Sequence, residues 1–186
     1  MLRFLIRLKG GAPRGELLRV VRAMARELGV EARNPKWTSY GALELDVFAS
    51  GRSDFELFVA ALEPLAAPEF THDLNIAPRF RPEEEIFSEA KSLFNAERYW
   101  ECHEILESIW RTKTGNEKAF LQGVILVCAA LVHHQKGEDT VALGILERAV
   151  RMLRPSQASY GAFRVDSLKA GSEEILRRKR FISFEV

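Results

Sequence analysis

The side chains best suited to chemistry are concentrated between Trp100 and Trp110, in the segment WECHEILESIW. If this segment is a helix, His103 and Glu107 share one stripe with the two tryptophans, because residues three or four apart are neighbours on a helix surface. A His and carboxylate pair of this kind is found as metal ligands, as a general base with its orienting acid, or as a hydrogen-bonded strut in a core. We favour the strut.

The same residues allow a catalytic interpretation. His103 would act as a general base oriented by Glu107, or both would bind a divalent metal that activates water, with Glu104 as the second carboxylate. The segment is close to the H-E-x-x-H motif of zinc proteases, but Glu107 stands where that motif has its second His ligand. We therefore do not expect a zinc protease, and we leave open whether the protein is an enzyme.

Two further polar side chains lie on the next predicted helix, which is apolar nearly all round. A short loop makes the two helices antiparallel neighbours, which puts Gln122 beside Glu107 or the second tryptophan. His133 lies about 12 Å beyond the level of His103 at 1.5 Å of rise per residue, too far to share one ion. We therefore expect no bound metal and no cofactor. The candidate ligand-binding residues are Trp100, Trp110, Gln122 and His133.

Two stretches, FNAERYWECHEILESIW and FLQGVILVCAALVHHQKG, resemble the uncharacterised prokaryotic family called domain of unknown function 309. The resemblance covers about residues 86–155. Leu126 stands where the family pattern has a polar residue. The resemblance implies an all-helical domain and no particular activity. The residues that fill the family pattern are Phe94, Asn95, His103, Glu104, Glu107, Trp110, Gln122, Gly123 and His133.

Helical periodicity dominates the C-terminal half, with Asn116 and Ser172 as expected N-caps. A self-similarity of about 40 residues follows the pattern of small and large residues in tetratricopeptide (TPR) repeats, which predicts degenerate TPR-like helical hairpins. Residues 181–186 alternate in polarity, which predicts an extended strand docked on either domain. The predicted helices are 83–95, 98–111, 117–136, 139–154 and 172–179.

The N-terminal half alternates between strand and helix periods in the order βαββαβ. This order predicts a ferredoxin-like domain, in which two helices cover one face of a four-stranded antiparallel sheet. The expected fold class is therefore α+β, with a ferredoxin-like domain at 1–76, a linker at 77–82 and an all-helical domain at 83–186. The expected strands are 2–8, 30–33, 42–49 and 70–76, and the helices are 14–28 and 53–62, with Ser53 as N-cap.

Charged residues are expected to face each other across two strands of this sheet. Arg3 and Arg7 lie on the polar face of the first strand, and Glu44 and Asp46 on that of its predicted neighbour. This arrangement predicts cross-strand ion pairs and not an aromatic platform for bases. The chain has 27 Lys and Arg against 26 Asp and Glu, so it lacks the basic character that attracts nucleic acid. We do not expect nucleic-acid binding.

The cysteine count and the apolar segments indicate a cytoplasmic protein. Cys102 and Cys128 lie in apolar segments, where Cys packs as a small hydrophobic residue, and two cysteines are too few for a disulfide framework. The longest apolar run, 119–132, is shorter than the roughly 18–20 residues that cross a bilayer. The first residues lack the features of a signal peptide. We expect no membrane contact.

These patterns favour a binding module with a semi-buried His/Glu/Trp/Gln pocket for a small molecule or a protein. The alternative is a metal-dependent or general-base hydrolase that uses His103 and Glu107. A second alternative is a structural adaptor or a nucleic-acid-associated protein. Self-association as a homo-oligomer is left open, as are the ligand and the pathway.

Overall fold

The computed structural model describes residues 1–75, 81–153 and 159–186. The chain divides into two compact units, Met1–Arg79 and Phe80–Val186. The first unit contains a four-stranded antiparallel sheet and the second is mainly helical, so the fold class is α+β, as predicted. Most of the predicted linker at 77–82 lies outside the described residues.

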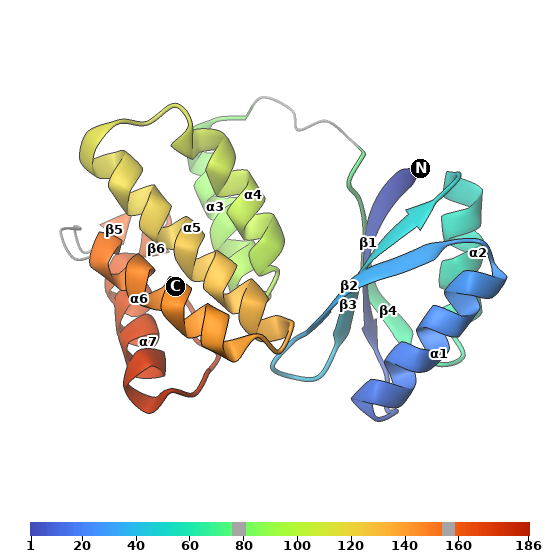
Figure 1. The fold of residues 1–186 in the computed structure, drawn as a ribbon. Coiled ribbons are helices and arrows are strands. Elements are labelled where there is room, and N and C mark those ends of the chain that lie inside the picture. The colour runs from blue at the N-terminus through green and yellow to red at the C-terminus, as the bar shows by residue number, and fades with distance from the viewer. Residues whose placement is uncertain (76–80, 154–158) are drawn as a thin grey trace. The chain divides into compact units, whose positions relative to one another are not determined.

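The N-terminal unit is a sheet with two helices on one face (Figure 1). The sheet order is β2-β3-β1-β4, and each neighbouring pair is antiparallel. The core forms where alternate residues of β1 and β3 meet the apolar stripes of α1 and α2. The elements are β1 (Leu2–Lys9), α1 (Arg14–Glu27), β2 (Glu31–Trp37), β3 (Leu43–Ala49), α2 (Arg52–Leu62) and β4 (Ala67–Asp73).

The opposite face of this sheet carries the predicted ion pairs. Arg7 and Glu44 are direct partners across β1 and β3, and their side chains approach to 2.8 Å. Arg3 pairs with Asp46 at 3.0 Å. Lys36 on β2 also pairs with Glu44, whose carboxylate therefore bridges two cations. The prediction of cross-strand ion pairs is confirmed.

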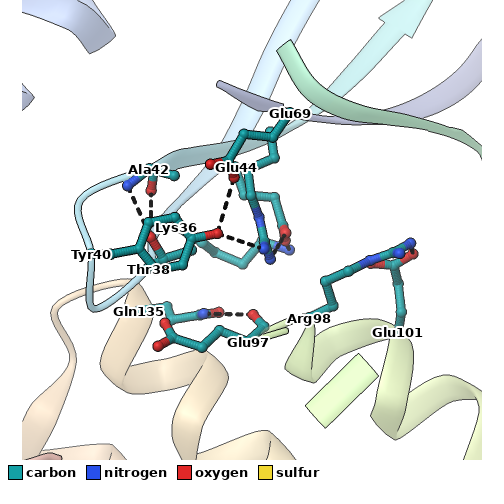
Figure 2. A network of polar contacts seen from close by, with 11 residues as sticks. Lys36, Thr38, Tyr40, Ala42, Glu44, Glu69, Glu97, Arg98, Glu101 and Gln135 are labelled. Atoms are coloured by element: carbon teal, nitrogen blue, oxygen red, sulfur yellow. Dashed lines mark hydrogen bonds and ion pairs between the residues drawn. The ribbon is translucent and has the colours of Figure 1, made fainter. Parts of the chain in front are cut away.

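Tyr40 extends this network in the loop before β3. Its hydroxyl accepts a hydrogen bond from Arg7 and donates one to Glu69, both at 3.0 Å; Figure 2 labels Tyr40, Glu44 and Glu69. Burial lowers the pKa of Arg7, but the Glu44 carboxylate and the hydrogen bonds that Arg7 donates to Glu44 and Tyr40 outweigh it, so the pKa is raised overall. Arg7 is therefore held as a cation.

Three element boundaries in this unit differ from the sequence prediction. β2 continues through Asn34 and Pro35, where a loop was expected, because β2 is an edge strand and Asn34 adopts φ 51° at a register shift. β4 begins at Ala67, earlier than expected, and predicted Ile76 lies outside the described residues. The N-cap of α2 is Gly51 and not Ser53, since Asp54 accepts the Gly51 N–H at 3.1 Å.

The C-terminal unit consists of five helices and a short hairpin within the described residues. Each helix from α3 to α6 packs against the next one along the chain. The longest helix, α5, is buried on almost every side, as expected for a helix that is apolar nearly all round. The elements are α3 (Glu83–Asn95), α4 (Tyr99–Trp110), α5 (Gly115–Gln135), α6 (Asp139–Leu153), β5 (Ser159–Tyr160), β6 (Phe163–Arg164) and α7 (Val165–Arg178).

By length and composition alone, α5 could span a membrane, with a mean hydropathy of 1.3. Of the 18 consecutive residues of α5 that are most apolar, 56% are buried inside the protein. A buried core helix of a soluble protein can have the same length and composition, so α5 is consistent with a soluble protein.

The end of the helical unit differs most from the prediction. The last helix begins at Val165 and not at Ser172, which lies buried inside α7 and donates its hydroxyl to the Leu168 carbonyl at 2.7 Å. α5 begins at Gly115, so Asn116 is not its N-cap. The hairpin of β5 and β6 was not predicted. Residues 181–186 form no strand and dock on the helical unit.

Candidate functional site

The candidate site lies on α4, which packs between α3 and α5 (Figure 1). The helix follows a tight turn at Glu97, and Arg98 pairs with Glu101 in the first helical turn. Tyr99, Cys102, Leu106 and Ile109 repeat at helical spacing in the sequence, which predicts one apolar stripe, and in α4 they form the buried face. The stripe that carries the two tryptophans lies beside this face and is only partly buried.

His103, Glu104 and Glu107 converge on this stripe. Their possible ligand atoms all lie within 4.8 Å of one another. Nδ1 of His103 and Oε1 of Glu104 are 3.4 Å apart. The side chain of His103 is 20% exposed, whereas that of Glu104 is 54% exposed. The cluster therefore has a covered imidazole and an accessible carboxylate.

The strut predicted between His103 and Glu107 is not formed. Nδ1 of His103 is buried and has no hydrogen-bond partner among the described residues, and the same is true of Nε1 of Trp110. Glu107 instead pairs with Arg111 at 3.5 Å, one turn further along α4. Leaving a buried polar atom unpaired costs about 1–3 kcal/mol. Two such atoms on one stripe of α4 therefore call for a functional explanation.

The tryptophans shape the two ends of the cluster. Trp100 stacks on His103 with ring centroids 5.4 Å apart and planes 10° apart, which fixes the orientation of the imidazole. Trp110 contacts Lys118 of α5, whose ammonium lies 4.5 Å from the ring centroid. The indoles thus act as packing and cation-binding surfaces at opposite ends of the stripe.

Two of the predicted ligand-binding residues are not joined to this cluster. His133 lies at the C-terminal end of α5, where Nδ1 pairs with Glu138. It does not belong to the metal-capable group found among the described residues. Gln122 is partly buried on α5, and no hydrogen bond connects its side chain to His103, Glu107 or Trp110 in the described structure.

The family comparison concerns the helical unit. The sequence profile of the family described as Domain of unknown function (DUF309) matches residues 87–145, which include all of α4 and α5. This part of the chain belongs to the DUF309 family. The resemblance stated from the sequence is thereby confirmed.

A solved structure, a conserved hypothetical protein from Thermus thermophilus, is similar to part of this chain. The two sequences are 34% identical, and the match covers 49% of this chain and 95% of the other, with a TM-score of 0.45. No curated protein matches the chain.

Both cysteines of the chain lie in the DUF309 region and pack against each other. Cys102 and Cys128 are free and fully buried, and their sulfur atoms lie 3.4 Å apart between α4 and α5. Burial and the hydrogen bond with Cys128 raise the pKa of the Cys102 thiol well above its ordinary value. The two residues therefore pack as small core side chains, as the sequence predicted.

Sequence reasoning missed Gln135 and Glu97 at the other end of the DUF309 helices. Gln135 donates a hydrogen bond of 2.9 Å to the backbone carbonyl of Glu97, shown in Figure 2. Glu97 has a left-handed φ of 56°, which usually favours Gly or Asn, so its residue type is no signal of a turn. The bond ties the α3–α4 turn to the end of α5.

One pocket of the helical unit lies away from the cluster. It has a volume of about 360 Å³ and contains none of His103, Glu104 and Glu107. Lys113 lies along its wall and pairs with Glu83 at 2.9 Å. The pocket is lined by Glu83, Glu84, Phe87, Lys113, Glu117, Gly161 and Ala162.

Proposed function

We propose that the DUF309 region is a binding module for a divalent transition-metal ion, held by His103, Glu104 and Glu107. The observation that carries this proposal is the convergence of one imidazole and two carboxylates within 4.8 Å. Imidazole nitrogen and carboxylate oxygen are ligands of Zn²⁺, Fe²⁺ and related ions. The unpaired Nδ1 of His103 supplies the nitrogen.

The distances support an ion of this size. Ligand bonds of 2.0–2.1 Å in tetrahedral geometry place two ligand atoms roughly 3.4 Å apart. His103 Nδ1 and Glu104 Oε1 are separated by 3.4 Å. Glu107 is 34% exposed, so its carboxylate is free to turn from Arg111 toward the ion.

The sequence argument against a metal rested on the distance between His103 and His133. Glu104 supplies a second carboxylate, so the ligand set no longer depends on His133. With three ligands from one helix, the outer coordination positions of the ion stay open to water or to a small anionic ligand. This arrangement also supports the small-molecule binding that the sequence favoured.

The hydrolase alternative would use the same ion to activate water. The pocket of about 360 Å³ that the described residues form lies at Glu83 and Lys113 and does not include the cluster. We therefore propose binding, with no reaction assigned.

We also propose that the N-terminal unit is a ferredoxin-like domain and the helical unit a set of TPR-like hairpins. The order βαββαβ and the sheet order β2-β3-β1-β4 support the first assignment. Successive packing of α3, α4, α5 and α6 supports the second. The two free buried thiols support a reducing, cytoplasmic location.

Metal titration tests the proposed ion site. Full-length protein is stripped with a chelator and titrated with Zn²⁺ by calorimetry and with Co²⁺ by visible absorption. We expect saturable binding of about one ion per chain and a Co²⁺ ligand-field band. His103→Ala and Glu104→Gln should each weaken binding by at least about tenfold, which corresponds to 1.4 kcal/mol.

Two matched variants serve as controls. His133→Ala removes a histidine outside the cluster, and Glu147→Gln removes an exposed carboxylate on α6. Both should leave binding unchanged. Absence of saturable binding to the wild-type chain, or equal losses in control and cluster variants, would overturn the proposal.

A further inference from the structure

Residues 181–186, here called the arm, follow α7 and lie against the helical unit without forming a helix or strand. Phe181, Ile182 and Phe184 pack against the hydrophobic core, and Val186 is buried within it. The arm contacts residues from three separate parts of the chain. The surface that receives it, here called the arm seat, consists of Phe94, Asn95, Glu97, His134 and Gly171.

Phe184 is the central anchor of the arm. Its ring lies 5.5 Å from the ring of Phe94, centroid to centroid. A Cβ on Gly171 would come within 2.5 Å of the Phe184 ring, so only glycine leaves room for it. This explains a glycine inside α7, where it lowers helix stability. The seat is therefore shaped for an aromatic ring.

Polar groups fix the register of the arm. Asn95 accepts a hydrogen bond of 3.1 Å from the backbone N–H of Val186, and Glu97 accepts one of 3.1 Å from the Ser183 hydroxyl. At the other end, Phe181 stacks on His134, with centroids 4.1 Å apart and planes 9° apart. A backbone contact combined with spaced apolar anchors is the way in which proteins recognise extended peptides.

The connection between α7 and the arm favours release. Lys179 follows α7 with a left-handed φ of 51°, a conformation that strains a residue with a side chain. In a released arm, Lys179 is free to adopt ordinary helical angles. The arm has no strand pairing to lose, so its attachment depends on the contacts with the arm seat.

We propose that the arm seat is a peptide-recognition surface that binds the arm of a second copy of this chain when its own arm is released. Every copy carries both an arm and a seat, and the same contacts form within one chain or between two. Exchange of such a segment across a strained hinge is an established route to dimers. This proposal is independent of the metal site.

The test uses an amidated, fluorescent peptide with the sequence of residues 180–186. The receptor is the full-length chain with Phe181→Ala and Phe184→Ala, which weakens its own arm. We expect a saturable rise in fluorescence anisotropy. Binding should fall at least about tenfold when the peptide carries Phe184→Ala or the receptor carries Gly171→Ala, since removing a packed ring costs well over 1.4 kcal/mol.

Gly144→Ala is the matched control, because Gly144 lies in α6 and a Cβ there meets nothing within 4 Å. It should leave peptide binding unchanged. Circular dichroism checks that each receptor is folded, and wild-type protein replaces the double variant if that variant is not. Light scattering of the wild type should show dimers that increase with concentration and disappear in Phe184→Ala. Absence of saturable peptide binding to a folded receptor, or a wild type that stays monomeric, would overturn the proposal.

Discussion

Nδ1 of His103 lies 3.4 Å from Oε1 of Glu104, yet it makes no hydrogen bond to any residue that the structure describes. Its expected partner, Glu107, pairs with Arg111 instead. The cluster thus holds an imidazole whose buried nitrogen makes no hydrogen bond within the described structure. An ion would satisfy that nitrogen and offset the charge of the two carboxylates.

The first prediction concerns the coupling between His103 and Glu107. In metal-free protein, a double-mutant cycle with His103→Ala and Glu107→Ala should show a coupling energy below about 0.5 kcal/mol, because no bond joins the two side chains. Saturating Zn²⁺ should stabilise the wild type by about 2.7 kcal/mol at 100 times the Kd and stabilise neither variant to that extent. Urea unfolding measures both quantities. A metal-free coupling of about 1 kcal/mol or more would restore the strut that the sequence favoured.

The second prediction concerns the carboxylate that bridges Arg7 and Lys36. Glu44→Gln removes the negative charge that pairs with both buried cations, so we expect a loss of about 3 kcal/mol in the free energy of unfolding. Glu31→Gln is the control, because its ion pair with Arg33 is exposed and should change stability by less than about 0.5 kcal/mol. Equal effects of the two substitutions in chemical denaturation would show that the bridge is not a significant source of stability.

The third prediction concerns Gly123, which follows Gln122 on α5. A Cβ on Gly123 would come within 2.8 Å of the Leu153 side chain, so α6 packs directly on the α5 backbone there. We expect Gly123→Ala to destabilise the protein by about 1–3 kcal/mol through overpacking. A Cβ on Gly144 would meet no atom within 4 Å beyond its chain neighbours and its own helix backbone, so Gly144→Ala should instead stabilise the protein by about 0.5–1 kcal/mol. Thermal unfolding shifts of the same sign in both variants would contradict this account.

The fourth prediction follows from the raised pKa of the Cys102 thiol. The folded state holds its proton more tightly than the unfolded state. Stability should therefore be unaffected below the unfolded pKa of about 8.5, and decrease as the pH rises from there toward the folded value. The maximum slope is about 1.4 kcal/mol per pH unit. Cys102→Ala should flatten this decrease in urea unfolding curves measured between about pH 8 and pH 10; an unchanged slope would be the contrary result.

The sequence alone determined those elements in which apolar and polar residues alternate with a regular period. The helical stripe on α4 placed Tyr99, Cys102, Leu106 and Ile109 in the core, and all four are buried. Alternation along β1 and β3 was sufficient to predict that Arg3 and Arg7 would share a face with Glu44 and Asp46, because alternate side chains of a strand lie on one face. These features depend on local periodicity, which the sequence contains.

Tertiary packing decided the features that depend on contacts between distant residues. The sequence predicted that the last helix begins at Ser172, but α7 begins at Val165 and continues through Gly171, where the ring of Phe184 occupies the space of the missing Cβ. The hairpin of β5 and β6 has strands of only 2 residues, too short for a period-2 pattern.

In the candidate site, too, local spacing determined some features and tertiary contacts determined the others. Spacing on a helix was enough to place His103 and Glu107 on one stripe. It did not determine which carboxylate would approach the imidazole, because rotamers and partners such as Arg111 fix that choice. The approach of Glu104 to His103, the separation of His133 and the docking of the arm on Asn95 are set by three-dimensional contacts that no local pattern encodes.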